Sequence, residues 1–378
     1  MFLQTLQLRQ FRNYQAQSIE FSAPKTILLG ENAQGKSNLL EAVELLATLK
    51  SHRTGRDRDL VKADAAEGQI QARLQRELGI STLKLTLRSS GRRTAILNGE
   101  TLRRQQDFLG TLNAVQFSCL DLDLVRGGPS GRRVWMDTLL AQLEPVYAYI
   151  LQQYTQALKQ RNAFIRQQTE AADPSQPPQL EATQLALWDA QLVTLGTRVI
   201  RRRARVLQRL APIAQRWHEA ISGSTETLAI TYQPNVPIIV DETEQIQQAF
   251  FAKLQAKGVP EYYQRTTLVG PHRDDIEFTI NQTPARQYGS QGQQRTLVLA
   301  LKLAELKLIE DVIGEPPLLL LDDVLAELDL KRQNSLLDAV QDRFQTLITT
   351  THLGSFDAQW LRSSQILKVE QGEIAGTE

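Results

Sequence analysis

An eight-residue stretch near the N-terminus has the residue types and the spacing that bind the phosphates of a nucleotide. Its two glycines allow a tight backbone turn, so that amide hydrogens at the start of the next helix point at the phosphates. Lys36 would reach the outer phosphates of ATP, and the Ser37 hydroxyl would bind Mg²⁺. The predicted phosphate-binding loop consists of Gly30, Glu31, Asn32, Ala33, Gln34, Gly35, Lys36 and Ser37.

The segments on either side of this loop agree with that chemistry. Residues 25–29 are mostly apolar and predict a strand, and residues 38–49 have the pattern of a helix. A phosphate-binding loop needs a strand before it and a helix after it. The sequence therefore favours a nucleotide site over a glycine-rich turn that matches by chance.

Two carboxylates follow an apolar run near the other end of the chain. Residues 317–321 predict a buried parallel strand, and Asp322 and Asp323 follow it directly. Asp322 would hold Mg²⁺ through water, and Asp323 would orient or deprotonate the attacking water. These are the parts of a Walker B strand. Alternatively, the two residues only cap a helix or start a turn.

A third pattern lies between these two, at the start of a strongly helical stretch. Ser290, Gly292 and Gln293 open that helix and resemble the signature motif of ABC-type ATPases. In such proteins this motif contacts the γ-phosphate of a nucleotide bound by another protomer. The alternative is that Ser290 simply caps the helix. All three patterns occur in the chain order of an ABC-type head, which favours the first interpretation.

Further motifs extend the resemblance over almost the whole chain. They are residues 8–14, 124–133, 270–275 and 290–295, and they resemble the RecF family of bacterial recombination mediators. That family is similar to the heads of SMC proteins. The resemblance implies an α/β fold: an ABC-type ATPase head, in which a phosphate-loop lobe with a mixed sheet carries an inserted helical lobe.

The same resemblance implies a function. It predicts a slow ATPase that uses ATP and Mg²⁺, and that forms an ATP-dependent homodimer on double-stranded DNA near gap junctions without sequence specificity. It also implies cytoplasmic work with RecO and RecR to load RecA in gap repair and replication restart. No membrane partner is expected.

Three more positions take their roles from the resemblance. Gln116 stands where a catalytic Q-loop glutamine would report the nucleotide, although it also fits a surface amide on an edge strand. Residues 326–329 resemble the D-loop that crosses the dimer interface, and Asp329 matches its carboxylate. His352 stands near the place of a catalytic switch histidine. It lies two positions past an apolar run, so the sequence leaves open whether it matches that histidine's position. Residues 119–122 depart from the Pro-Glu-Asp-Leu that is usual in the family.

Asp323 predicts slow hydrolysis. ABC-type heads usually carry glutamate here, and aspartate holds its carboxylate roughly an ångström nearer the backbone. A displacement of about that size in a water-positioning group costs on the order of 10²-fold in rate. Slow turnover suits a clamp that ATP closes and hydrolysis opens.

Length and composition agree with such an ATPase but do not select it. The length of 378 residues predicts two lobes. We place the helical lobe at residues 119–222, and the ATPase lobe at residues 1–118 together with residues 223–378. No apolar stretch of about 18 residues predicts a membrane span. The first residues do not resemble a signal peptide, and the single Cys119 excludes an intramolecular disulfide. Asn98 and Gly99 predict a two-residue hairpin turn, and residues 172–178 an exposed connector.

Several arginines of the expected helical lobe recur on one helix face. A local basic stripe would bind DNA phosphates rather than bases, because the net charge of the chain is only +1. The alternative is a solvated helix face. The predicted DNA-binding residues are Arg198, Arg202, Arg205 and Arg209, with Arg201 on the same face.

Other proteins with a phosphate loop fit less well. A transporter nucleotide-binding subunit would share the loop and the signature, but not the motifs at residues 126–129 and 270–273. An SMC protein would need hundreds of heptad residues between its half-heads. An ATPase-nuclease of the overcoming-lysogenization type would need a nuclease domain beyond His352.

Overall fold

A six-stranded mixed sheet gathers segments from both ends of the chain. The computed structural model describes residues 1–171, 182–223, 225–340, 343–354, 356 and 358–376. The strand order is β15-β14-β3-β13-β12-β8, and neighbouring strands are parallel except for the pair β14 and β15. The strands are β3 Lys25–Leu29, β8 Ala114–Ser118, β12 Leu318–Asp322, β13 Thr346–Thr350, β14 Ser364–Glu370 and β15 Glu373–Gly376.

An antiparallel sheet of order β2-β1-β4-β5-β6-β7 faces the mixed sheet. Helix α1 packs against residues of both sheets in one hydrophobic core. Leu6, Leu39 and Leu320 share this fully buried core. Asn98 and Gly99 have positive φ between β6 and β7, which confirms the predicted hairpin turn. The elements are β1 Phe2–Phe11, β2 Tyr14–Glu20, α1 Lys36–Thr48, β4 Glu67–Arg76, β5 Gly79–Arg88, β6 Thr94–Leu97 and β7 Glu100–Thr101.

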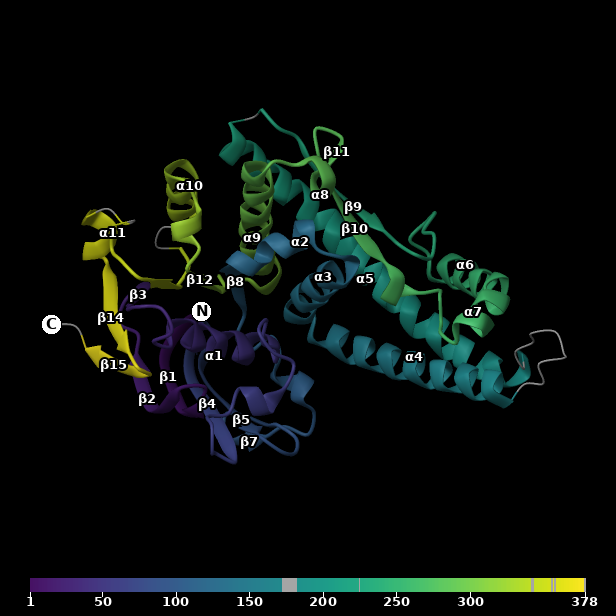
Figure 1. The fold of residues 1–378 in the computed structure, drawn as a ribbon, viewed down its shortest axis with the longest axis horizontal. Coiled ribbons are helices and arrows are strands. Elements are labelled where there is room, and N and C mark those ends of the chain that lie inside the picture. Colours follow the sequence, from purple (N-terminus) through teal and green to yellow (C-terminus); the bar gives the residue numbers. More distant parts are fainter. Residues whose placement is uncertain (172–181, 224, 341–342, 355, 357, 377–378) are drawn as a thin grey trace.

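Long helices carry the middle of the chain away from these sheets (Figure 1). This part of the chain begins with the short helix α2 Asp123–Arg126. The longer helices α3 Pro129–Leu143, α4 Pro145–Ala171 and α5 Ala182–Ser222 follow it. The expected connector at residues 172–178 lies outside the described residues. Then follow β9 Leu228–Gln233, α6 Thr243–Ala256, α7 Gly258–Gln264, β10 Asp275–Ile280 and β11 Thr283–Pro284. Elements β9 and α6 pack against α5, α7 packs against α4, and β10 packs against α3.

The chain then returns to the mixed sheet. The remaining helices are α8 Ala285–Tyr288, α9 Gln291–Ile313, α10 Leu330–Val340 and α11 Ala358–Arg362. Short 3₁₀ helices occupy Asp57–Asp59, Gln105–Phe108, Cys119–Leu122, Pro271–Arg273 and Leu325–Glu327. Elements β9, α6 and α7, which follow the boundary placed at residue 222, pack against α4 and α5. The three predicted domain ranges stay a prediction.

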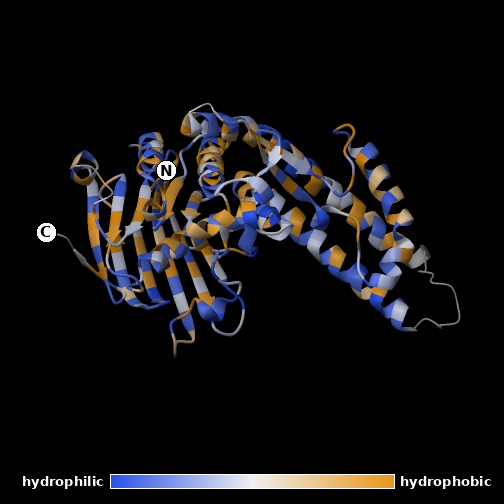
Figure 2. Ribbon diagram, turned by 45° about the horizontal axis from the view of Figure 1, so that its top comes forward, coloured by the Kyte–Doolittle hydropathy of each residue, from blue (hydrophilic) through white to orange (hydrophobic). Residues whose placement is uncertain are grey.

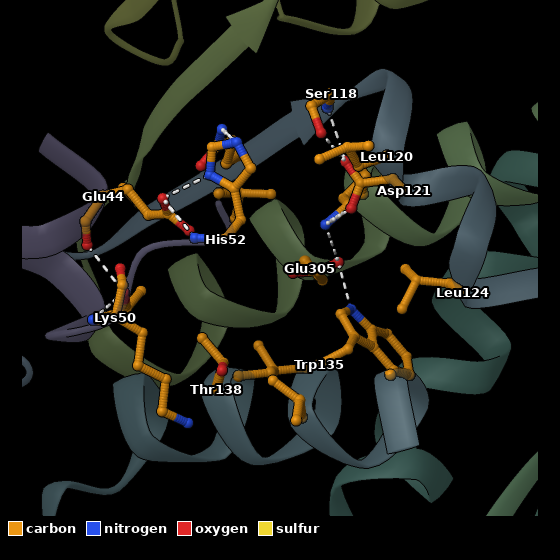
Figure 3. A pocket seen from close by; sticks show the side chains of 18 of the residues that line it. Glu44, Lys50, His52, Ser118, Leu120, Asp121, Leu124, Trp135, Thr138 and Glu305 are labelled. Atoms are coloured by element: carbon orange, nitrogen blue, oxygen red, sulfur yellow. Dashed lines mark hydrogen bonds and ion pairs between the residues drawn. The ribbon is translucent and has the colours of Figure 1, made fainter. Parts of the chain in front are cut away.

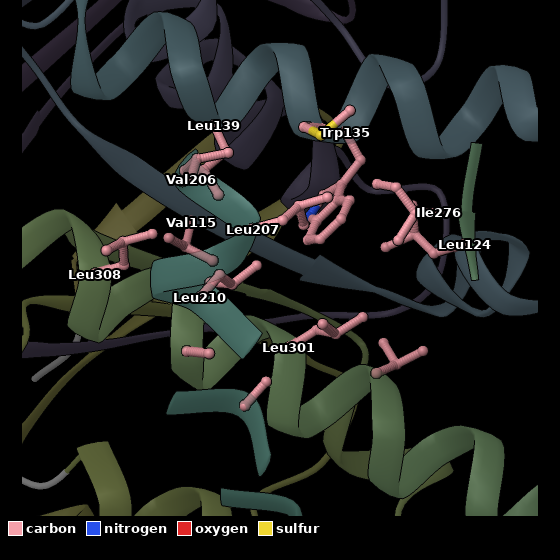
Figure 4. Packing of buried hydrophobic residues seen from close by; sticks show 14 of the residues in the cluster. Val115, Leu124, Trp135, Leu139, Val206, Leu207, Leu210, Ile276, Leu301 and Leu308 are labelled. Carbon is pink, nitrogen blue, oxygen red and sulfur yellow. The ribbon is translucent and has the colours of Figure 1, made fainter. Parts of the chain in front are cut away.

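One hydrophobic core joins the helical part to the mixed sheet (Figure 4). Val115 of β8, Leu139 of α3, Leu207 of α5 and Leu301 of α9 belong to it. Helix α9 is buried along most of its length, so it fixes the helical part against the sheet. Hydrophilic and hydrophobic residues alternate along the elements (Figure 2), and no described helix is long and apolar enough to cross a bilayer.

Candidate nucleotide-binding site

The predicted phosphate loop connects β3 to α1 at the carboxyl edge of the mixed sheet. Gly35 is the N-cap of α1 and has a φ of +116°, a conformation that side chains rarely adopt. A Cβ on Gly30 would lie 2.3 Å from the carbonyl oxygen of Val369, so only glycine fits there. The free amide groups at the start of α1 and the positive end of its dipole therefore open toward the loop.

Lys36 lies inside the curve of the loop. Its Nζ donates to the carbonyl oxygens of Gly30 at 2.7 Å and Glu31 at 2.8 Å. The side chain is buried, and these two hydrogen bonds fix the position of its ammonium group in the loop. A phosphate bound there would offer this ammonium stronger acceptors than neutral carbonyls.

Residues of the N-terminal turn brace the loop from behind, a role that the sequence analysis did not assign. Asn13 Nδ2 donates to the Gln34 carbonyl at 3.0 Å, and Asn13 Oδ1 accepts from Asn38 Nδ2 at 2.8 Å. The Tyr14 hydroxyl donates to the Gly35 carbonyl at 3.0 Å, and burial raises the pKa of this phenol. Asn13 and Tyr14 stood in one of the recognised motifs, which was the only sequence signal for them.

The C-terminal hairpin supports the same loop. The backbone N–H of Gln371 donates to Gln34 Oε1 at 2.6 Å, and that of Gly372 donates to the Gln34 carbonyl at 2.9 Å. Gly372 has a φ of +80°, and an added Cβ would lie 2.8 Å from the Asn13 carbonyl oxygen. Gln34 therefore joins the first and last parts of the chain at the site.

The two carboxylates of β12 meet the loop from the neighbouring side. Ser37 Oγ donates to Asp322 Oδ1 at 2.7 Å, and Thr349 Oγ1 donates to the same oxygen at 2.8 Å. A hydroxyl and a carboxylate in contact are the oxygen ligands that suit Mg²⁺. These two residues, the predicted Mg²⁺ ligands, thus fit that ion together with a nucleotide's phosphates.

Asp323 leaves the strand with an unusual backbone turn. Its φ is +52°, and its N–H donates to Thr349 Oγ1 at 2.9 Å. Partial burial raises the pKa of Asp323 above its ordinary value, and the charge of Asp322 raises it further while Lys36 lowers it. A carboxylate with a raised pKa is a better proton acceptor than an ordinary aspartate.

Gln116 lies in β8 opposite Leu320 of β12, and its side chain lines a pocket of about 440 Å³ between α1, β8 and α3 (Figure 3). The end of the Gln116 amide lies 3.4 Å from His52 Nε2, and His52 Nδ1 lies 2.7 Å from Glu44. Burial lowers the pKa of His52, but Glu44, Glu41 and Asp322 together raise it above its ordinary value. The structure thus places Gln116 beside His52, and its catalytic role stays a prediction.

The opposite wall of this pocket belongs to the helical part. Lys302 Nζ contacts Asp121 at 2.9 Å, and Trp135 Nε1 donates to Glu305 at 2.7 Å (Figure 3). Burial lowers the pKa of Lys302, but the charges of Asp121 and Glu305 outweigh it, so that the pKa is raised. The segment after β8, where this chain departs from the usual family residues, is held here by charge.

His352 is exposed just after β13, and its N–H lies 3.3 Å from Thr350 Oγ1. Thr350 pairs with Leu29, the residue before Gly30. Because these strands are parallel, His352 lies at the same sheet edge as the phosphate loop and Asp323. Its role as a switch residue stays a prediction.

The predicted signature residues occupy the start of α9. Ser290 caps this helix: its Oγ accepts from the N–H of Gln293 at 3.2 Å, and its own N–H donates to Gln293 Oε1 at 2.8 Å. Gln293 Nε2 donates to Glu226 at 2.9 Å. Ser290 is exposed, and within the described residues no hydrogen bond or ion pair joins Ser290, Gly292 or Gln293 to the phosphate loop. Within one chain, the structure therefore does not bring the predicted signature residues to the phosphate loop.

The arginine face of α5 is partly neutralised. Arg201 and Arg205 share Asp241 at 2.6 and 2.7 Å, and Arg202 contacts Glu144 at 2.9 Å. Arg198 and Arg209 are exposed, and neither forms an ion pair within the described part of the chain. The basic stripe is therefore weaker than the sequence indicates, and its DNA role stays a prediction.

Comparison with known proteins gives relatives over the full length. The family "RecF/RecN/SMC N terminal domain" matches residues 2–375. The DNA replication and repair protein RecF of Nostoc punctiforme is 70% identical over 374 residues, covering 99% of both chains. That of Gloeothece citriformis is 65% identical, with 99% of both chains covered.

Solved structures give the same result. A structure described as the recombination mediator protein RecF with ATP in the RecFOR pathway has a TM-score of 0.90 and 30% identity, covering 100% of this chain and 98% of its own. An SMC head bound to the C-terminal winged-helix domain of ScpA has a TM-score of 0.55 at 15% identity, covering 99% of this chain and 96% of its own, and shows the fold alone. The predicted ABC-type head with a helical lobe is thereby confirmed. On its sequence and its fold together, this chain belongs to the RecF family of the RecF/RecN/SMC N-terminal domain proteins.

Proposed function

We propose that this protein is an ATP-dependent recombination mediator of the RecF type. It binds ATP, closes as a homodimer on duplex DNA near single-strand gaps, and opens when slow hydrolysis removes the γ-phosphate. The observation that carries this proposal is the placement of Lys36, Ser37, Asp322 and Asp323 at one sheet edge, while Ser290 is presented on a separate, exposed helix start. One chain thus holds two incomplete halves of a nucleotide site.

The first half would bind and hydrolyse the nucleotide. Lys36 and the amide groups at the start of α1 would hold the phosphates, and Asp323 would accept the proton of the attacking water. Ser37 and Asp322 would hold Mg²⁺, which neutralises phosphate charge when it is bound. These roles agree with the contacts of Lys36 with the loop and of Ser37 with Asp322.

The second half would come from another copy of the chain. Two large apolar side chains flank the signature helix and the D-loop: Tyr288 is 73% exposed and Leu330 is 75% exposed. In the proposed dimer the partner chain would cover these two side chains. In a two-fold dimer each nucleotide would lie between Lys36 of one copy and Ser290 of the other.

DNA and partner proteins complete the proposal. Arg198 and Arg209 would contact phosphates of duplex DNA, since these exposed side chains keep their charge free of ion pairs within the described residues. RecO and RecR are the proposed partners, and membership of the RecF family and the solved relatives described in the RecFOR pathway support this proposal. With them the protein would load RecA in the cytoplasm.

Light scattering of the purified protein tests this function. We expect a monomer with ADP, a dimer with ATP, and a dimer retained on duplex DNA only in the ATP state. If the mass with ATP equals that with ADP, with and without DNA, the proposed clamp is wrong and a monomeric ATPase is favoured.

A further inference from the structure

The guanidinium of Arg332 lies between the signature helix and the D-loop. Arg332, in the first turn of α10, donates through Nη2 to the Gly292 carbonyl at 2.9 Å and through Nε to Thr296 Oγ1 at 2.8 Å. Its Nη1 contacts the Asp329 carboxylate, and its backbone N–H donates to Asp329 Oδ1 at 3.0 Å. One side chain thus contacts both elements that would face the partner's nucleotide.

The local structure favours this close approach. A Cβ added to Gly292 would lie 3.1 Å from Arg332 Nη2, so the glycine leaves room for the guanidinium. In the opposite direction, Arg295 of the signature helix donates to the Glu327 carbonyl of the D-loop. Arg332 of α10 thus bonds to the backbone of the signature helix, and Arg295 of the signature helix bonds to the backbone of the D-loop.

The charges explain why an arginine stands here. Asp329 is exposed beside the start of α9, which would face the phosphates of a bound nucleotide. An unpaired carboxylate near phosphates is unfavourable, and the arginine neutralises it. The backbone N–H and the charge of Arg332 hold the pKa of Asp329 below its usual value. The planar fork of an arginine holds a carboxylate, a carbonyl and a hydroxyl in one fixed geometry, which the compact, rotatable ammonium of a lysine does not impose.

We propose that Arg332 is a positioning residue that joins the D-loop carboxylate Asp329 to the first turn of the signature helix, so that both meet the partner's nucleotide as one unit. This inference rests on the proposed composite site. Arg332 acts through Ser290, Gly292 and Asp329 and needs no contact with the nucleotide. Its loss would lower the rate of hydrolysis without weakening the phosphate loop of its own chain.

The test compares Arg332→Ala with Lys331→Ala, a matched control that removes the same charge from an exposed neighbour on the same helix. For Arg332→Ala we expect kcat to fall roughly 10- to 100-fold, because positioning errors near an ångström have that cost. ATP affinity at low protein concentration and the thermal unfolding midpoint should stay as in the wild type. Added guanidinium ion should restore part of kcat, and Lys331→Ala should match the wild type.

Two further variants keep the outcome decisive. Arg332→Lys retains the charge but loses the fork, so its kcat should lie between those of the wild type and Arg332→Ala; it decides the matter if the alanine variant unfolds. Asp329→Ala combined with Arg332→Ala should cost less than the product of the single effects, because both act through one contact.

The wild type in the same assay separates the two proposals. If the wild type neither dimerises with ATP nor hydrolyses it, the proposed function itself fails. If the wild type does both, a normal kcat in Arg332→Ala overturns only the present inference. Weakened ATP binding by the folded variant's own phosphate loop, or a reduced kcat that guanidinium does not restore, also overturns it.

Discussion

At the scale of single residues, the site depends on hydrogen bonds that fix the positions of its two carboxylates. Asp322 accepts hydrogen bonds from Ser37 and Thr349 through the same oxygen, and Thr349 also accepts from the N–H of Asp323. This threonine therefore fixes both carboxylates relative to the loop. The two acids have different surroundings, so we expect them to have different roles.

Asp323 predicts a specific pH dependence of hydrolysis. Burial raises its pKa, so the carboxyl is protonated, and unable to accept a proton, at a pH where an ordinary aspartate is still ionised. We expect kcat to fall as the pH decreases through this raised pKa. Asp323→Asn should retain ATP binding, lower kcat by about 10²- to 10⁴-fold, remove the acidic limb and accumulate closed dimers. A pH–rate profile of this variant that keeps the wild-type limb would contradict the assignment.

At the scale of elements, the phosphate loop is braced by both ends of the chain. The turn between β1 and β2 and the turn between β14 and β15 both bond to Gln34. The loop's shape is therefore set by elements that lie more than 300 residues apart in sequence. We infer that the loop is preorganised for phosphate, because ordering it on binding would cost conformational entropy.

This brace predicts that Asn13→Ala weakens ATP binding. The change removes two hydrogen bonds, to the Gln34 carbonyl and from Asn38. At about 1 kcal/mol for each bond, we expect Kd for ATP to rise roughly 5- to 30-fold. Gln15→Ala, at an exposed position in β2, is the control and should leave Kd unchanged. Titration calorimetry measures both, and equal affinities would show that the brace has no effect on binding.

The sequence predicted the local parts of this site and missed the long-range ones. The phosphate loop, the strand ending in Asp322 and the helix that begins after Ser290 follow from residues close together in the chain, where spacing reports the structure. The bond between Gln371 and Gln34 joins distant residues, and no spacing reveals it. The pairing of Arg201 and Arg205 with Asp241 depends on how a loop folds back on α5, which the helical pattern of α5 cannot show.

The arginine face of α5 predicts unequal effects on DNA binding. Neutralising the exposed pair with Arg198→Gln and Arg209→Gln should weaken binding to all duplexes alike and lower the salt slope by about two ions. The matched pair Arg201→Gln and Arg202→Gln removes charges that Asp241 and Glu144 already compensate, so its effect should be smaller. Fluorescence anisotropy over a salt series measures both slopes. Unchanged slopes in both variants would identify a solvated face.

At the scale of the whole molecule, the proposed composite site requires two chains for each catalytic event. The phosphate loop and the start of the signature helix lie on different elements, and within the described residues no hydrogen bond or ion pair joins them. Each variant that damages one half should therefore be inactive alone. Lys36→Ala should lose ATP binding, and Ser290→Arg should bind ATP but neither dimerise nor hydrolyse it, because a bulky cation would occupy the γ-phosphate position.

Mixing these two inactive variants tests the composite site most directly. In a mixed dimer, Lys36 of the Ser290→Arg chain meets Ser290 of the Lys36→Ala chain, which restores one complete site of two. Because neither variant forms a dimer with itself, every ATP-bound dimer in the mixture is mixed and has one complete site of two. At equal amounts we therefore expect ATP hydrolysis to reappear at up to roughly half of the wild-type rate. A mixture that stays as inactive as its components would contradict a nucleotide site shared between two copies.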